Sequence, residues 1–202
     1  MHCPVSQSIM ESRRDYVRSC CYRDTRFGPV AVLWSADRGR PEIHRVFLSR
    51  EGFSAEQHVT EFFPESFFSS CTEVNEVAER IVSFLSGDDI RFSLDITSLD
   101  LCPQFQQKVL RAEHGIPRGY VSTYGRIAKH IGNSRAARAA GSALANNPFP
   151  LLIPCHRAIR SDGSLGGYQG GTAMKRSLLE MEGVFFDTTG RISKETSFFK
   201  DW

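Results

Sequence analysis

The sequence predicts an α+β fold, in which a small N-terminal domain of strands and a helix precedes a mostly helical domain that contains a helix-turn-helix. Alternating and helix-spaced apolar residues occupy the first half, and two short helical patterns joined by a glycine follow after residue 120. Charge divides the chain in the same way, because residues 1–102 hold 11 Lys/Arg against 16 Asp/Glu and residues 103–183 hold 11 against 4. We therefore expect domains over 1–102 and 103–183, with a tail over 184–202.

The composition is that of a globular protein, with 41% hydrophobic and 24% charged residues in a chain of 202. No apolar stretch approaches the roughly 18 residues of a membrane-spanning helix. Charged residues between positions 11 and 15 interrupt any signal-peptide pattern. We therefore expect an intracellular protein, cytoplasmic or nuclear according to its source, that is monomeric in solution and has no membrane partner.

Six cysteines are spread along the chain without a C-x-x-C pair. In a reducing compartment such cysteines stay as thiols. Their spacing contains no tight pair of metal ligands, so we expect no metal. A site that combines Cys3, Cys20 or Cys21 with a histidine is the alternative.

The N-terminal domain begins with about 20 polar residues without periodicity, which we expect to fray. Two runs rich in β-branched and aromatic residues, 27–34 and 43–48, flank a polar turn at 37–41 and predict a β-hairpin. Residues 50–70 contain many Phe and Ser and allow no firm assignment.

A helix and a further strand complete the predicted N-terminal domain. Apolar residues at helical spacing predict a helix over 72–85, with Thr72 as its N-cap and Gly87 as its stop. Strict alternation then predicts a strand over 90–96. No residue of this half has the pattern of a catalytic group.

The second domain begins with a predicted helix over 104–113. Thr123 is placed to cap a short helix over 124–130, and Ser134 to cap a second helix that runs to about Ala145. The second of these helices is rich in alanine, and small side chains let a helix lie close to another surface. Together with the excess of basic residues, this pattern favours a nucleic-acid surface over an ordinary packed helix.

The residues suited to chemistry follow an apolar run, 149–153, which predicts a buried strand closed by Pro154. Cys155 comes next, with His156 and Arg157 as its neighbours. An adjacent imidazole or cation promotes the thiolate form that a cysteine nucleophile requires. Taken alone, the tetrapeptide also suits a buried, unreactive cysteine.

A glycine-rich loop, a helix and an aromatic tail end the chain. Four glycines between positions 165 and 171 allow the backbone to approach a ligand closely. An amphipathic helix is predicted over 173–182, ending at Gly183. The tail is expected to dock back onto the protein through its aromatic residues, which are Phe185, Phe186, Phe198, Phe199 and Trp202.

These segments form one ordered series between residues 105 and 183 that resembles a known family. The series is Ile116-Pro117-x-Gly119, Thr123-Tyr124-Gly125, Arg138-Ala139-x-Gly141, Asn147-Pro148, Ile153-Pro154-Cys155-His156-Arg157, Gly166-x-Tyr168, Gly170-Gly171, Lys175 and Leu178-Leu179-x-x-Glu182-Gly183. In this order and spacing it resembles the 6-O-alkylguanine-DNA alkyltransferases, also called methylated-DNA–protein-cysteine methyltransferases. The N-terminal half resembles that family only in its size and its coarse strand–helix content.

The resemblance implies DNA repair by direct reversal of damage. It implies that the helix-turn-helix binds double-stranded DNA from the minor groove and that an alkylated guanine is flipped out of the duplex. The alkyl group would then pass to Cys155 in one irreversible displacement, so that each molecule acts once and needs no metal or organic cofactor. The chemistry agrees, because a thiolate suits attack on an alkyl carbon and a stacked base cannot present its alkyl group in line.

The resemblance also implies roles for the catalytic residues. His156 is the expected base, acting through a water, and Glu182 is expected to orient it. A glutamate at a helix C-terminus opposes the helix dipole, which supports a specific partner for Glu182. Tyr124 is the expected donor to the leaving guanine, Asn147 is expected to brace the active-site turn, and Arg157 is expected to form a structural salt bridge.

The remaining expected contacts lie on the helix-turn-helix and around the guanine pocket. The expected DNA contacts are Arg138, which would fill the vacated stack, and Arg135, Ser134, Thr123, Ala137 and Gly141. The expected pocket residues are Tyr168, Gln169, Gly170, Ala158 and Leu165. The bulk of Gln169 is expected to influence which alkyl groups fit.

Three other classes of protein share parts of this pattern. Alkyltransferase-like proteins bind the lesion on the same scaffold but lack the acceptor cysteine, which is present here as Cys155. A helix-turn-helix regulator needs neither the cysteine–histidine segment nor the glycine-rich loop. A cysteine hydrolase needs an oxyanion hole and a base from a distant segment, and the sequence shows no pattern for either.

Overall fold

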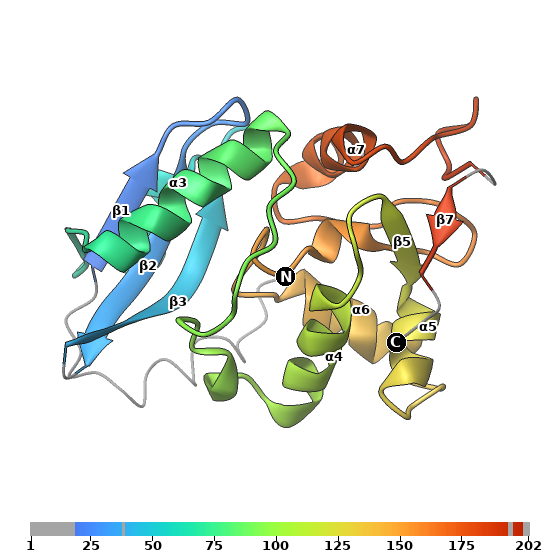
Figure 1. Ribbon diagram of the computed structural model, residues 1–202, viewed down its shortest axis with the longest axis horizontal. Helices are drawn as coiled ribbons and strands as arrows, with labels where there is room; N and C mark the ends of the chain where they lie inside the picture. The colour runs from blue at the N-terminus through green and yellow to red at the C-terminus, as the bar shows by residue number, and fades with distance from the viewer. Residues whose placement is uncertain (1–18, 38, 194–195, 200–202) are drawn as a thin grey trace.

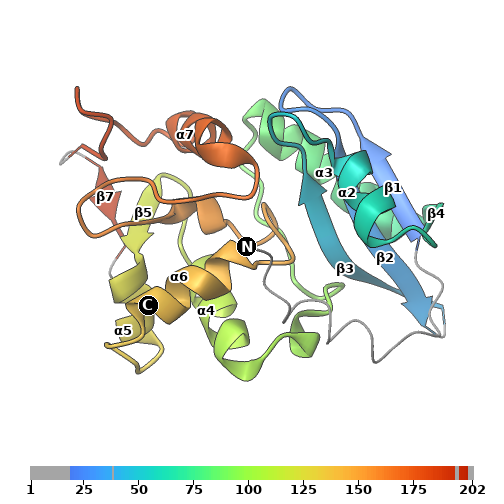
Figure 2. The ribbon, with the colours of Figure 1, turned by 180° about the vertical axis from the view of Figure 1, so that it is seen from behind.

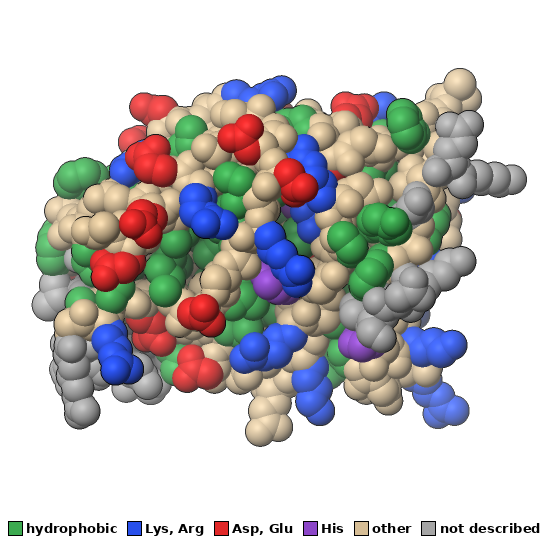
Figure 3. All heavy atoms as spheres, in the orientation of Figure 1, with side chains coloured by type: hydrophobic (Ala, Val, Ile, Leu, Met, Phe, Trp, Pro, Cys, Tyr) green, Lys and Arg blue, Asp and Glu red, His purple; other side chains and the backbone are tan. Residues whose placement is uncertain are grey.

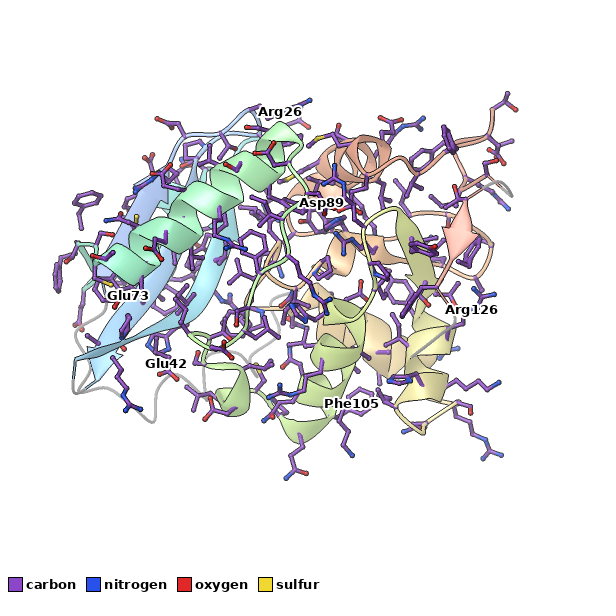
Figure 4. The ribbon with its side chains drawn as sticks, viewed as in Figure 1. Arg26, Glu42, Glu73, Asp89, Phe105 and Arg126 are labelled. Carbon is purple, nitrogen blue, oxygen red and sulfur yellow. The ribbon has the colours of Figure 1, made fainter. Side chains whose placement is uncertain are left out.

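The computed structural model describes residues 19–37, 39–193 and 196–199. Cys3, Trp202 and nearly all of the segment expected to fray lie outside the described residues. In the described part, a sheet flanked by helices lies beside a second, more helical half (Figure 1). The connector that carries Asp89 runs between the two halves (Figure 4).

The N-terminal sheet has four strands in the order β3-β2-β1-β4. They are β1 (Ser19–Arg23), β2 (Val30–Asp37), β3 (Arg40–Leu48) and β4 (Phe67–Phe68). β2 pairs with β1 and with β3 in antiparallel register, whereas β4 joins β1 in parallel. The predicted hairpin is therefore confirmed as β2–β3, with its strand bounds shifted towards the turn.

Both faces of this sheet are covered by a helix, as the opposite views of Figures 1 and 2 show. One face carries α3 (Thr72–Ser86) and the other carries α2 (Ala55–Phe62). Successive residues of β2 accordingly enter different cores, because Val32 packs on the α3 side and Leu33 packs with Val59 of α2. Burial on both faces explains why β2 is apolar over its first five residues, 30–34.

Helix ends in this half differ in part from the prediction. α2 lies in the segment that had no firm assignment, and it begins with a capping box. The Ser54 hydroxyl accepts from the Gln57 N–H (3.2 Å), and the Gln57 side chain accepts from the Ser54 N–H (2.7 Å). Thr72 is the first residue of α3 rather than its N-cap, which is Cys71, whereas Gly87 ends the helix at φ 117° as predicted.

The strand predicted over 90–96 is wrong. The segment is irregular and meets the sheet near its end, where the Ile43 N–H donates to the Ile96 carbonyl (2.6 Å). Its alternating pattern has another cause. Phe92 is buried against Phe84 of α3, with 5.9 Å between ring centroids, so one side of an extended connector faces the core.

The second half packs helices around a small parallel sheet. Its helices are α4 (Gln104–His114), α5 (Tyr124–His130), α6 (Ala137–Ala145) and α7 (Gly171–Met181), with 3₁₀ turns η1 (Leu99–Leu101) and η2 (Cys155–Arg157). The sheet has the order β6-β5-β7, formed by β5 (Tyr120–Thr123), β6 (Ala158–Ile159) and β7 (Ser197–Phe198). The helices predicted over 104–113 and 173–182 are thus confirmed, within two residues at each end.

The two short helices of the predicted helix-turn-helix are present as α5 and α6. The Thr123 hydroxyl caps α5 by accepting from the Arg126 N–H (3.2 Å), as the sequence predicts. Ser134 does not cap α6, because that helix begins only at residue 137. Ser134 instead lies in the connecting turn, which closes where the Ala136 N–H donates to the Asn133 carbonyl (2.9 Å).

The tail docks on the second half, as predicted, but not every one of its aromatic side chains takes part. β7 pairs with β5, and the guanidinium of Arg126, labelled in Figure 4, lies 4.9 Å from the centroid of the Phe198 ring. Arg176 lies over Phe186 in the same way (4.5 Å). Phe185 is 60% exposed and takes no part in this docking.

One hydrophobic core extends through both halves. It joins Val46 of β3 to Leu110 of α4 and to Leu152, close to the cysteine segment. The Val46 N–H also donates to the Pro148 carbonyl (2.8 Å). The N-terminal half therefore packs directly on the turn that leads to Cys155.

The surface reflects the charge division of the sequence. Asp and Glu side chains gather over the N-terminal half, and Lys and Arg side chains project at the lower right, near α5 (Figure 3). In the described part of the chain, no helix combines the length and the apolar character needed to cross a membrane.

Candidate active site

One buried asparagine builds the turn that carries the cysteine. Asn147 accepts a hydrogen bond from the Phe149 N–H (2.9 Å) and donates from Nδ2 to the Ile153 carbonyl (3.1 Å). The strand predicted between these residues is wrong, since Leu151 has a φ of +74°, which an extended strand does not allow. The apolar run reflects burial of a tight turn in the core. Asn147 therefore braces this turn, as expected.

Cys155 opens η2 and is buried, with 6% of its surface exposed. Burial raises the pKa of its thiol to about 11. A hydrogen bond with the Asn147 side chain and the charge of Lys175 lower this pKa, whereas the charge of Glu113 raises it. The thiol therefore keeps its proton at neutral pH unless a base removes it.

His156 is the residue expected to act as that base. Its Nε2–H donates to Glu182 Oε1 (2.9 Å), and its Nδ1 is buried with no hydrogen-bond partner among the described residues. Burial lowers the pKa of His156 in spite of the neighbouring carboxylate. The ring is therefore neutral at neutral pH, and Nδ1 presents its lone pair.

Glu182 is held in a buried, two-pronged ion pair. Arg157 donates to it from Nη2 (2.7 Å) and from Nε (2.9 Å), and donates from Nη1 to the Ile116 carbonyl (2.6 Å). Burial alone would raise the pKa of Glu182, but His156 and Arg157 lower it to about 2. Glu182 is therefore ionised. The structural salt bridge expected for Arg157 is confirmed.

A cavity of about 410 Å³ opens onto the cysteine, a size that suits a small ligand. Five predicted residues line it: Cys155, Tyr124, Gly141, Tyr168 and Gln169. The other lining residues are Arg50, Leu144, Ala145, Arg160, Gly166 and Gly167. Three predicted pocket residues, Ala158, Leu165 and Gly170, lie outside this lining.

Tyr124, the first residue of α5, stands against the glycine-rich loop. A Cβ atom at Gly166 would lie 2.7 Å from the Tyr124 hydroxyl, and one at Gly141 would lie 3.7 Å from its ring. Gly166 also has a φ of +72°, so both space and backbone favour glycine there. Burial, helped by the charges of Glu113 and Cys155, raises the pKa of Tyr124 to about 12. The phenol therefore keeps its proton and is a donor.

The glycine-rich loop is tied to the rest of the site by side chains. Gln169 Nε2 donates to the Asn147 carbonyl (2.6 Å), which links the loop to the active-site turn. The buried ammonium of Lys175 donates to the Ala158 carbonyl (2.6 Å), and burial lowers the pKa of Lys175 to about 8. The Tyr168 hydroxyl is buried and has no hydrogen-bond partner among the residues described.

The helix-turn-helix presents basic side chains beside this cavity. Of the expected DNA contacts, those exposed are Ser134, Arg135 and Arg138, and Ala137 is partly exposed. Gly141 lines the cavity instead, and Thr123 uses its hydroxyl to cap α5. The exposed arginines therefore lie on α6 and the turn before it, and α6 also supplies Gly141, Leu144 and Ala145 to the cavity lining.

The N-terminal half reaches the site through two residues that no motif predicts. Phe84 of α3 packs edge-on against the His156 ring, with 5.9 Å between centroids. Arg50, just after β3, lines the cavity. Both are brought there by packing between the halves, for which the sequence holds no local signal.

Comparison with known proteins agrees with this geometry. Residues 104–184 match the family model described as 6-O-methylguanine DNA methyltransferase, DNA binding domain. A methylated-DNA–protein-cysteine methyltransferase of Methanothermobacter thermautotrophicus is 47% identical over 111 residues, which are 55% of this chain and 62% of that protein. One of Methanosarcina acetivorans is 37% identical over 120 residues, 59% of this chain and 76% of that protein. The chain thus spans less than two thirds of the first of these relatives.

Solved structures extend the likeness into the N-terminal half. Mycobacterium tuberculosis OGT in complex with DNA has a TM-score of 0.63 and 28% identity, covering 81% of this chain and 92% of that one. The M. tuberculosis O6-methylguanine methyltransferase has a TM-score of 0.62 and 27% identity, with coverage of 82% and 92%. These spans are longer than the second half alone, so the sheet-containing half shares the fold.

Proposed function

We propose that this chain, which belongs to the methylated-DNA–protein-cysteine methyltransferase family, moves the alkyl group of a 6-O-alkylguanine in DNA onto its own Cys155. The observation that carries the proposal is the place of this cysteine. It lies at a cavity, next to a neutral imidazole whose Nδ1 is free of partners among the described residues, with a phenol in the cavity lining. Such a site can form a thiolate and donate a proton to a leaving group.

In the proposed reaction, the Cys155 proton passes to Nδ1 of His156 through a water. The thiolate attacks the alkyl carbon, the bond from that carbon to the guanine oxygen breaks, and its electron pair passes to the base. Glu182 stays ionised and stabilises the imidazolium through Nε2–H. The hydrogen bond from His156 Nε2–H to Glu182, which the fold already provides, thus prepares His156 to act as the base.

Tyr124 completes the proposed reaction at the leaving group. Negative charge develops on the guanine as the alkyl group departs, and the Tyr124 phenol donates a hydrogen bond or a proton to it. The product on Cys155 is a thioether, which water does not cleave under mild conditions. Each protein molecule therefore acts once.

The proposed DNA partner is a duplex bound from its minor groove, with the protein acting as a monomer inside the cell. The exposed Arg135 and Arg138 would contact the duplex, and Arg138 would fill the gap that the flipped base leaves. That M. tuberculosis OGT was crystallised in complex with DNA supports this partner.

Mapping the methylated cysteine tests the proposal. The protein is incubated with a duplex that carries one 6-O-methylguanine, then digested, and each cysteine peptide is weighed. We expect one methyl group on Cys155 and none in a Cys155→Ala variant, whereas Cys102→Ala, which alters a half-buried thiol elsewhere, should leave transfer intact. Tight lesion binding without transfer would indicate an alkyltransferase-like binding protein, and methyl transfer to another cysteine would refute the assignment.

A further inference from the structure

A buried carboxyl group lies behind the active site and has no part in the proposed reaction. Glu113, in the last turn of α4, is 0% exposed, and neither of its carboxyl oxygens has a hydrogen-bond partner among the described residues. A buried, unpaired carboxylate is costly, so such a group takes up a proton. A glutamate in this place calls for a reason, since leucine would pack there without that cost.

The charged and titratable groups that interact electrostatically with Glu113 belong to the active site itself. They are Lys175 of α7, Arg157 and Cys155 of η2, and Tyr124 of α5. The Lys175 ammonium donates to the Ala158 carbonyl (2.6 Å), and the nearby Ala158 N–H lowers the pKa of Glu113 without forming a hydrogen bond with either carboxyl oxygen. Lys175 and Glu113 therefore both lie at the main chain of Ala158, three residues after the nucleophile.

These groups set the charge near the cysteine. Burial raises the pKa of Glu113 to about 8 against the opposing charges of Lys175 and Arg157. Burial lowers the pKa of Lys175 to about 8, although ionised Glu113 opposes this. Near pH 7, Glu113 is therefore neutral and Lys175 is charged. An ammonium nearby lowers the pKa of Cys155, and a carboxylate raises it.

We propose that Glu113 is a positioning residue that controls, through its own proton, how readily Cys155 ionises. When Glu113 is protonated, the positive charge of Lys175 favours the thiolate unopposed. When Glu113 loses its proton at alkaline pH, its negative charge holds the thiol in its protonated form, and Lys175, whose pKa is also about 8, loses the charge that favours the thiolate. The inference rests on the proposed function, because it concerns the same nucleophile.

Iodoacetamide tests the inference without DNA. The thiolate of Cys155 displaces iodide from this reagent, and mass spectrometry of the Cys155 peptide gives the rate between about pH 6.5 and pH 9.5. Glu113→Gln removes the charge and keeps the shape. We expect the ratio of the variant rate to the wild-type rate to be about 1 at the acid end and about 3 to 10 at the alkaline end. Glu113→Leu should show the same rise, so the inference can still be tested if only one of the two variants folds.

Glu180→Gln is the matched control, because it removes a charge from the half-exposed Glu180–Arg176 pair of α7. Its ratio should stay flat. A flat ratio for a folded Glu113 variant, or an equal rise in the control, overturns the inference. Methyl transfer is measured separately on the wild-type protein. Failure of transfer together with a rising ratio would refute only the proposed function, whereas normal transfer with a flat ratio would refute only the part given to Glu113.

Discussion

Glu182→Gln is the substitution whose cost follows most directly from the structure. The change keeps the shape of the side chain but leaves the guanidinium of Arg157 buried without its counter-charge. The two side chains are only 2% and 8% exposed. Breaking a buried pair by removing one partner costs about 3–5 kcal/mol. The pKa of Glu182, lowered to about 2, has the same sign, because His156 and Arg157 favour its ionised form.

A second glutamate–arginine pair nearby supplies the comparison. Glu180 and Arg176 lie 2.8 Å apart, but their side chains are 48% and 45% exposed. An exposed pair on one helix contributes no more than about 0.5 kcal/mol. Burial, and not the contact distance, should therefore decide how far each substitution lowers the free energy of unfolding.

Urea unfolding, followed by the fluorescence of buried Trp34, measures both free energies. We expect Glu182→Gln to lower the free energy of unfolding by about 3–5 kcal/mol and Glu180→Gln by less than about 0.5 kcal/mol. Equal losses in the two variants, or a loss below about 1 kcal/mol for Glu182→Gln, would refute the view that the buried pair supports the site.

Three more predictions follow from the same geometry. The pKa of Glu182 is lowered on folding, so its contribution to stability is present above pH 4.5 and is lost as the pH falls towards about 2; acid unfolding of the wild type, compared with Glu182→Gln, checks this. Tyr124→Phe should slow single-turnover transfer by about 100-fold and leave the affinity for a lesion duplex unchanged; a loss of affinity alone would contradict its assignment as donor. Gly166→Ala places a Cβ 2.7 Å from the Tyr124 hydroxyl at a φ of +72° and should cost about 1 kcal/mol and slow transfer, whereas Gly39→Ala, which has a similar φ of +78° but nothing within 4 Å of its added Cβ, is the control for transfer.

Local patterns predicted the parts of the fold that local contacts build. Thr123 caps α5 through a bond three residues away, and the sequence shows both partners. The glycine-rich loop and the cysteine–histidine segment, both recognised in the sequence, likewise meet at the cavity in the structure. The capping box of Ser54 and Gln57 was an equally local signal for α2, but the surrounding Phe and Ser residues obscured it.

Apolar runs gave a wrong prediction where a buried segment is not an extended strand. The apolar run before Pro154 is buried as a turn, with Leu151 at positive φ, and not as a strand. The sequence also held no signal for Arg50 or Phe84, since packing between the halves brings them to the cavity and to His156. Contacts between the two halves of the chain are the part of the site that this sequence did not reveal.

The stoichiometry of transfer tests the central claim most directly. A known amount of protein is mixed with a large excess of duplex carrying radiolabelled 6-O-methylguanine, and the label bound to protein is counted over time. The proposed reaction predicts a plateau at one methyl group per molecule, all of it on Cys155, that does not rise with longer incubation. Continued release of methyl groups into solution, or no label on the protein while the lesion stays bound, would contradict it.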